Sequence, residues 1–235
     1  MEKFLTGKIS LVTGGTRGIG RAIAAALARS GSRVVICGRD ARSVESSARD
    51  LAAETGAEVA GCPADVRRPE DVEALFAFMD RFGGVHILIN NAGLGIFRRV
   101  AELTYADWAL TIDTNLTGVY LCSHAALARF RNFGGGFIVN IGSLAGKNPF
   151  SGGAAYNASK FGLTGFTEAM MLDHRFDNVR VSLIMPGSVS TGFGSGTADW
   201  KIAPEDVAEA VLAVLRMPER TLISRVEIRP SRPQK

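Results

Sequence analysis

The chain has few cysteines, few histidines and no long apolar run. Its three cysteines and three histidines lack the close spacing of metal ligands or of a disulfide framework. No window of about 18 apolar residues is present, so we expect no membrane-spanning helix and no membrane partner. The opening MEKFLTG lacks the apolar region of a signal peptide. These absences predict a reduced, cytoplasmic protein whose cysteines are small core residues and which has no metal site.

Charge of one sign is also scarce. The net charge is +4, and the arginines are spread along the chain without a basic run, so we expect no nucleic-acid partner. With 235 residues and 46% hydrophobic content, the chain can bury one good core, and one domain over residues 1–235 suffices. Part of the positive excess suits a phosphorylated cofactor.

Short apolar segments alternate with segments of helical spacing to the end of the chain, without a linker or an internal repeat. This alternation predicts an α/β fold, a Rossmann-type three-layer α/β/α sandwich with a seven-stranded, doubly wound, mostly parallel sheet. The expected strands lie near 8–13, 33–38, 57–61, 85–90, 136–142, 179–185 and 222–229. The expected helices lie near 18–30, 41–55, 69–82, 106–131, 154–176 and 204–216.

A glycine-rich turn joins the first expected strand to the first expected helix. Gly14, Gly18 and Gly20 fall between the apolar run of residues 8–13 and a helical pattern that starts at Ile19. Glycines let the backbone approach a pyrophosphate, and a helix N-terminus offers free N–H groups and a partial positive charge. This segment therefore predicts a dinucleotide-binding domain, although a lone glycine triplet would also fit a flexible turn.

The end of the second expected strand indicates which dinucleotide is bound. An acid there would bind the ribose 2′-hydroxyl of NAD, whereas an arginine accommodates the 2′-phosphate of NADP. Gly38 stands where the acid is expected, Arg39 follows it, and Arg17 lies in the glycine loop, so we predict that NADP(H) is preferred over NAD(H). Asp40 is either the N-cap of the next helix or, with a one-residue shift, a ribose ligand.

Tyr156 and Lys160 stand at i and i+4, so they share one face of an expected helix. Ser143 follows the apolar run GFIVNIGS, at the strand end where parallel sheets place their chemistry. Moving a tyrosine pKa from about 10 to about 7 requires about 4 kcal/mol, which one cation about 4 Å away supplies at an effective dielectric of about 20. The three residues therefore predict an acid–base site, while an isolated Y-x-x-x-K pair also fits a surface helix.

Several spaced motifs together resemble a known family from about Thr6 to Pro230. The motifs are T-G-G-T-R-G-I-G at 13–20, N-N-A-G at 90–93, T-N-L-T-G around Asn115, Ser143, Y-N-A-S-K at 156–160 and P-G-S-V-S-T at 186–191. With these motifs the chain is similar to the short-chain dehydrogenase/reductase superfamily in its compact one-domain form, and to its 3-oxoacyl-carrier-protein reductases, small carbonyl reductases and 3-hydroxy-acid dehydrogenases.

The resemblance implies a catalytic role for four residues. Tyr156 is the implied general acid/base, and Lys160 lowers its pKa and binds the nicotinamide ribose. Ser143 is expected to hydrogen-bond the substrate carbonyl or hydroxyl. Asn115 is expected to hold a water in a proton relay behind Lys160, although it could simply cap or kink a helix. The implied reaction is hydride transfer between a nicotinamide and a carbonyl carbon.

The resemblance also implies a set of cofactor-binding residues. Asp65 is the implied adenine contact, although it could be a loop acid before two arginines, and Thr191 could serve only turn chemistry. The full expected set is Gly14, Thr16, Arg17, Gly18, Ile19, Gly20, Arg39, Asp65, Val66, Asn90, Ala92, Gly93, Tyr156, Lys160, Pro186, Gly187, Val189 and Thr191.

The leading hypothesis is an NADPH-dependent reductase of ketones, aldehydes or 3-oxoacyl compounds. The alternatives are a catalytically silent cofactor sensor, which the intact catalytic residues disfavour, and a sugar-nucleotide epimerase, for which too few residues follow Thr191. The short glycine-rich segment after Gly187 offers only Phe193 and Trp200 as apolar contacts and predicts an open, weakly selective substrate pocket. Family analogy predicts a homotetramer, or a homodimer. The substrate stays open, because fold does not determine it.

Overall fold

The computed structural model describes residues 3–192 and 198–233. Seven strands form one sheet in the order β3-β2-β1-β4-β5-β6-β7, and each adjacent pair is parallel. The chain starts in the middle at β1, builds outward to β3, and returns to the centre to continue from β4 to β7. This confirms the predicted doubly wound sheet. The strands are β1 (Ile9–Thr13), β2 (Arg33–Gly38), β3 (Val59–Pro63), β4 (Ile87–Asn90), β5 (Gly136–Ile141), β6 (Val179–Pro186) and β7 (Arg225–Ile228).

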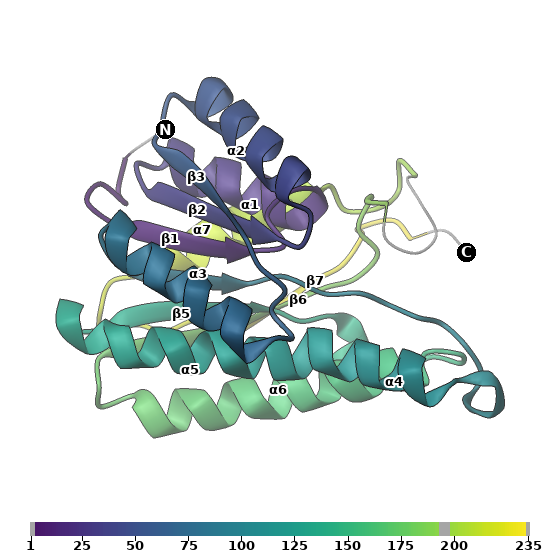
Figure 1. Cartoon of the computed structure of the whole chain (residues 1–235). Coiled ribbons are helices and arrows are strands. Elements are labelled where there is room, and N and C mark those ends of the chain that lie inside the picture. The colour runs from purple at the N-terminus through teal and green to yellow at the C-terminus, as the bar shows by residue number, and fades with distance from the viewer. Residues whose placement is uncertain (1–2, 193–197, 234–235) are drawn as a thin grey trace.

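Helices cover both faces of the sheet (Figure 1). One face packs on α1, α2 and α7, with Leu27, Ile36 and Val211 among its buried residues. The other packs on α3, α5 and α6, around Phe76 and Phe130. Because helices cover both faces, central strands such as β1 are buried at every position. The helices are α1 (Gly18–Arg29), α2 (Ala41–Thr55), α3 (Pro69–Phe82), α4 (Tyr105–Ile112), α5 (Gly118–Phe130), α6 (Ala154–His174) and α7 (Pro204–Leu215).

Several predicted elements have other bounds in the structure; the strand expected over 222–229, for example, spans only Arg225–Ile228. The single helix expected over 106–131 is divided, because residues Asp113–Thr117 form a π-helical turn between α4 and α5. The strand expected over 57–61 lies at Val59–Pro63, where Val59 pairs with Val34 and Pro63 with Gly38. Helical and strand spacing alone could not reveal either shift, since both depend on contacts with distant segments.

Two of the three cysteines belong to the core. Cys37 and Cys122 are buried, and burial raises the pKa of the Cys37 thiol to about 12. Cys62 is partly exposed and packs against the same core. Over residues 3–192 and 198–233, no helix has both the length and the apolar composition needed to span a membrane.

The parallel strands bring their carboxyl ends to one edge of the sheet. The glycine loop follows β1, Arg39 follows β2, and Asn91 follows β4. Ser143 comes two residues after the end of β5, and Gly187 directly follows β6. The strand order reverses between β1 and β4. A ligand bound at the carboxyl ends of these two strands can therefore contact residues from the β1–β3 half and the β4–β7 half of the sheet.

Candidate active site

The glycine loop has the shape of a phosphate cradle. Gly14 and Gly18 have left-handed φ angles of 64° and 54°. At Gly20 an added Cβ would lie 2.3 Å from the Gly14 carbonyl oxygen and 2.4 Å from Asn91 Nδ2, a separation that real Cβ atoms do not show. Gly20 therefore lets the start of α1 pack directly against the loop, and the N-terminus of α1 at Gly18 fits a pyrophosphate.

The loop after β4 is tied to the glycine loop. The Thr13 hydroxyl accepts hydrogen bonds from the N–H groups of Asn91 and Ala92, both at 3.0 Å. Asn91 Nδ2 donates to the carbonyls of Thr13 and Gly14 at 3.0 and 3.1 Å. Thr13 and Asn91 were not among the predicted site residues, although both lie in the sequence motifs at 13–20 and 90–93. These bonds fix the floor of the predicted cofactor site.

Asn90 was expected to line the cofactor site. Its side chain points into the protein instead, so the prediction is wrong for the side chain. It is 2% exposed, and its Nδ2 donates to Ser123 Oγ at 3.0 Å and Asn140 Oδ1 at 2.9 Å. Asn140 in turn donates to Thr167 Oγ1 at 2.8 Å. Asn90 therefore anchors a buried polar chain beneath the sheet edge, whereas Asn91 is only partly buried and holds the glycine loop.

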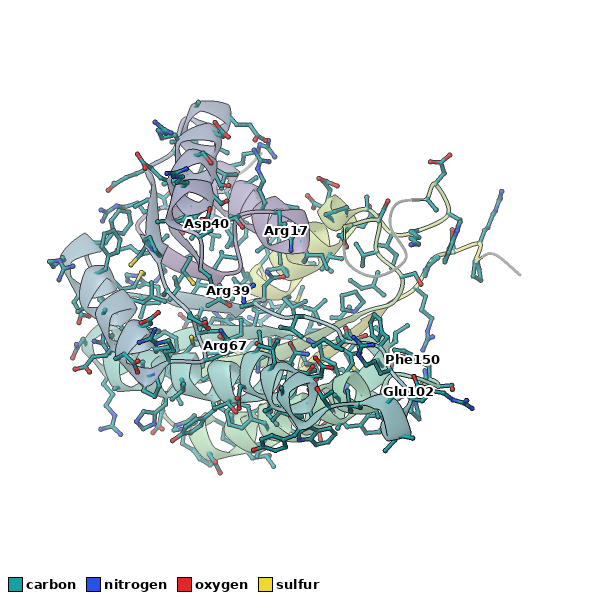
Figure 2. The ribbon with its side chains drawn as sticks, turned by 45° about the vertical axis from the view of Figure 1, so that its right-hand side comes forward. Arg17, Arg39, Asp40, Arg67, Glu102 and Phe150 are labelled. Atoms are coloured by element: carbon teal, nitrogen blue, oxygen red, sulfur yellow. The ribbon has the colours of Figure 1, made fainter. Side chains whose placement is uncertain are left out.

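Two arginines stand where a 2′-phosphate is expected. Arg17 is the N-cap residue of α1, and Arg39 follows the last residue of β2. Figure 2 shows both on the part of the molecule built by the first strands. Asp40 caps α2, since its Oδ1 accepts from Ser43 N at 2.8 Å. The prediction that Asp40 is the N-cap of this helix is therefore confirmed. The hydrogen bonds from Ser43 lower the pKa of the Asp40 carboxyl.

Asp65 forms an ion pair with the nearby Arg67. Arg67 Nε lies 2.9 and 3.0 Å from the two carboxylate oxygens, and this pairing lowers the pKa of Asp65, with a smaller contribution from Arg39. Val66 is buried against Gly118 at the start of α5. The loop-acid alternative thus has structural support, while the adenine contact stays a prediction.

The segment after β6 passes close to the glycine loop. A Cβ on Gly18 would lie 3.4 Å from Thr191 Cγ2. Val189 forms a β-bridge with Ile202, and Gly187 N donates to Ile228 O at 2.8 Å. One segment beside the glycine loop thus carries four of the expected cofactor contacts, Pro186, Gly187, Val189 and Thr191. Phe193, which was expected to contact the substrate, lies outside the described residues.

The three residues predicted to be catalytic come from two parts of the chain. Ser143 caps the short helical turn Leu144–Gly146, and Tyr156 and Lys160 lie on α6. The Ser143 side chain hydrogen-bonds the phenol of Tyr156. Lys160 is 7% exposed, and its ammonium donates to Ile141 O at 3.0 Å. The structure therefore brings the three residues together as the sequence predicted.

The expected effect of Lys160 on the Tyr156 phenol is not found. Burial raises the pKa of Tyr156, and the bond from Ser143 opposes this only in part. The Lys160 ammonium is bound to a carbonyl and lies 5.7 Å from the centre of the phenol ring. The protein alone thus holds a neutral phenol, which is a proton donor.

The burial of Lys160 lowers the free energy of unfolding, and unfolding experiments at several pH values can measure this effect. Burial lowers its pKa from 10.5 to about 8, so between these values the unfolded chain binds more protons and the free energy of unfolding rises with pH. We expect Lys160→Met to stabilise the cofactor-free protein by about 1–3 kcal/mol at pH 7, and less as the pH approaches 10.5. Urea unfolding at several pH values measures this, with the exposed Lys147→Met as control. A pH-independent difference would contradict it.

Asn115 joins three segments. Its Oδ1 accepts from Leu94 N at 2.9 Å, and its Nδ2 donates to Leu94 O at 2.8 Å and Ser159 Oγ at 3.0 Å. Both amide hydrogens are therefore used, so a relay water can only donate to Asn115. The π-helical turn places this residue inside, next to Gly93, where a Cβ would lie 3.2 Å from its Oδ1. Asn115 thus lies in a π-helical turn, and its role in a proton relay stays a prediction.

The sequence of this chain is similar to those of known proteins. The family model for short chain dehydrogenases matches residues 8–202. An uncharacterized oxidoreductase of Staphylococcus aureus (strain MRSA252) is 32% identical over 230 residues, covering 96% of this chain and 98% of that protein.

Solved structures of other dehydrogenases and oxidoreductases are also similar to this chain. An alcohol dehydrogenase from the archaeon Thermococcus sibiricus, complexed with 5-hydroxy-NADP, shares 31% identity with a TM-score of 0.89. A metagenomic short-chain oxidoreductase in complex with NADP shares 35% identity with a TM-score of 0.87. Each comparison covers 97% of this chain and 99% of the other. The chain belongs to the short-chain dehydrogenase/reductase superfamily and is an NAD(P)-dependent dehydrogenase or reductase.

Proposed function

We propose that the protein interconverts a carbonyl compound and an alcohol with NADP(H), and that its substrate is a ketone, an aldehyde or a 3-oxoacyl compound. The observation that carries this proposal is the hydrogen bond from Ser143 to a neutral Tyr156, beside a glycine cradle that fits a dinucleotide. Bound NADPH supplies the hydride that reaches the carbonyl carbon. The protein contributes the position of the substrate and the proton.

Each member of the trio has a distinct task in this reaction. The neutral phenol of Tyr156 donates its proton to the carbonyl oxygen as charge develops there. The Ser143 hydroxyl holds the same oxygen by a second hydrogen bond. The phenolate left behind keeps its hydrogen bond from Ser143. We expect the cationic form of Lys160, whose pKa is about 8, to stabilise this phenolate only when the cofactor is bound, since the cofactor-free protein shows no such effect. In the reverse direction Tyr156 accepts the proton of the alcohol.

The cofactor's two ends would meet different parts of the chain. The cradle of Gly14, Gly18 and Gly20 fits the pyrophosphate, and Lys160 fits the nicotinamide ribose. Thr191 and the Val189 backbone fit the carboxamide by family resemblance. The other proposed contacts are Thr16, Ile19, Asp65, Val66, Ala92, Gly93, Pro186 and Gly187.

The preference for NADP(H) is part of the proposal. It is supported by Arg17 and Arg39 at the ends of two elements, by the use of Asp40 as a helix cap, and by similar structures that are complexed with NADP or its 5-hydroxy derivative. We expect Arg39→Asp to weaken NADPH binding by about 1.5–3 kcal/mol, the scale of a hydrogen bond to a charged group.

NADH has no 2′-phosphate, so its affinity should change by less than about 0.5 kcal/mol. Titration calorimetry with both cofactors measures the difference. Arg49→Asp, an equal charge change at an exposed position on α2, is the control. Equal losses for NADH and NADPH would contradict the assignment of the 2′-phosphate.

A turnover screen tests the reaction itself. NADPH oxidation is followed with acetoacetyl thioesters, 3-oxo acids, diketones and aromatic aldehydes, and NADP reduction with hydroxy acids. We expect at least one carbonyl class to be reduced. If no substrate reacts while NADPH still binds, a cofactor sensor becomes the better account.

A homotetramer is part of the same proposal. Tyr120 on α5 and Phe161 on α6 are 48% and 44% exposed, and adjoining helices with such residues suit pairing between copies. The apolar Leu110, Ile112, Leu116 and Leu121 are only partly buried and are compatible with it. The mass in solution, by light scattering, measures the oligomeric state.

A further inference from the structure

Two phenylalanine rings flank the phenol of Tyr156. The Phe97 centroid lies 5.6 Å from that of Tyr156 with an interplanar angle of 79°, and 5.6 Å from that of Phe150 at 61°. Phe150 and Tyr156 are 6.3 Å apart. All three distances fall in the range of favourable aromatic contacts. We refer to Phe97, Phe150 and Tyr156 as the aromatic cluster.

The cluster is held in place from both sides. The Phe150 carbonyl accepts from Gly153 N at 3.2 Å and from Asn157 Nδ2 at 3.0 Å, and its ring lies so close to Gly153 that a Cβ there would be 2.6 Å from Cε2. Arg98, next to Phe97, forms a parallel β-bridge with the same glycine. Both rings are therefore fixed relative to α6, which carries Tyr156.

The two rings nevertheless remain accessible. Phe97 is 44% and Phe150 is 45% exposed, so large apolar surfaces lie next to the group that donates the proton. Exposed apolar surface beside a reactive group favours a ligand that covers it.

The charges near the cluster offer no net attraction for an anionic ligand. Arg98 is paired with Asp107 at 3.2 Å. Arg99 follows Arg98 in the sequence, and Figure 2 shows the acid Glu102 at the same end of the molecule as Phe150. Since both signs are present, the apolar rings are the feature that selects a ligand here.

We propose that the aromatic cluster binds an aryl group on the substrate, so that this enzyme prefers aryl ketones over alkyl ketones. The inference rests on the proposed function, because the carbonyl oxygen is taken to meet Tyr156 and Ser143. The neighbouring substituent then meets Phe97 and Phe150, and an aromatic face contacts these rings more favourably than a saturated ring of equal size. The hydride from NADPH joins the carbonyl carbon, and the proton of Tyr156 joins the oxygen, giving a 1-aryl alcohol and NADP.

The test compares three ketones with NADPH. Acetophenone carries an aryl group, cyclohexyl methyl ketone has similar bulk without a π face, and butanone is small. We expect the wild type to show the highest kcat/KM for acetophenone. Phe97→Leu and Phe150→Leu should each lower the ratio of acetophenone to cyclohexyl methyl ketone by about 3- to 10-fold. Phe133→Leu, a change at a ring that is 41% exposed and lies 4.3 Å from the His86 ring at an interplanar angle of 44°, should leave this ratio unchanged.

Two outcomes would overturn the inference alone. One is a wild type that reduces all three ketones with similar kcat/KM, and the other is an equal loss for all three in the leucine variants. A wild type that reduces none of them counts against the proposed function instead. In that case ligand-observed NMR of acetophenone decides, since Phe97→Leu/Phe150→Leu should weaken its binding about 10-fold or more; unchanged binding would refute the aryl site.

Discussion

Tyr156→Phe is expected to lower kcat for carbonyl reduction by about 10²- to 10⁴-fold, the usual contribution of a positioned acid or base. The change removes one hydroxyl and keeps the ring that contacts Phe97 and Phe150. The fold and the cofactor site are therefore retained, and NADPH affinity should stay within about threefold. Steady-state kinetics together with a fluorescence titration of NADPH measure both quantities.

Tyr120→Phe provides the matched control. Tyr120 lies on α5 and is 48% exposed, so the loss of its hydroxyl should leave kcat unchanged. If Tyr156→Phe retained more than about a tenth of the wild-type kcat, Tyr156 would not be the proton donor. A parallel loss of NADPH binding would instead indicate a structural effect.

Gly20→Ala is expected to weaken NADPH binding by about 10- to 100-fold and to destabilise the protein by about 1–3 kcal/mol. The added Cβ would stand 2.3 Å from the Gly14 carbonyl oxygen. Since that atom belongs to the backbone of the cradle, the loop itself must move. Titration calorimetry and urea unfolding measure the two effects.

Gly165→Ala separates this effect from helix propensity. Gly165 is an exposed residue of α6, and a Cβ there meets no atom within 4 Å. Alanine is the better helix former, so this variant should be more stable by about 0.5–1 kcal/mol with unchanged NADPH affinity. A Gly20→Ala protein that bound NADPH like the wild type would show that the cradle does not depend on this glycine.

Much of the fold could be predicted from the sequence because its signals are local. Helical and alternating apolar spacing located the sheet and its helices, and the glycine turn followed the first strand. The i, i+4 spacing placed Tyr156 and Lys160 on one face of α6. The carboxyl end of β5 then brought Ser143 to them, as parallel strand geometry requires.

The rest depended on contacts that spacing does not encode. Whether Asn90 or Asn91 faces the cofactor site depends on where β4 ends, and a shift of one residue turns the side chain to the other side. The pKa of Tyr156 depends on burial, which raises it and outweighs the hydrogen bond from Ser143. The Lys160 ammonium binds a strand carbonyl, and no sequence motif revealed this partner.

The aromatic cluster was missed for the same reason. Phe97 and Phe150 lie on separate loops, and no periodic pattern links them. Their meeting depends on the bridge between Arg98 and Gly153. The sequence predicted an open, weakly selective pocket from the segment after Gly187, and the ketone comparison distinguishes that hypothesis from an aryl site.

The π-helical turn at Asp113–Thr117 has a consequence for how this chain tolerates changes of length. Successive residues of a helix are rotated by about 100°, and a π turn holds one residue more than an α turn. Gaining one residue here would rotate all of α5 by that angle, whereas the loss of one residue can be absorbed if the π turn becomes an α turn. After an insertion Cys122 and Phe130, now buried, would turn away from the core, so this turn is expected to tolerate a one-residue deletion more readily than an insertion.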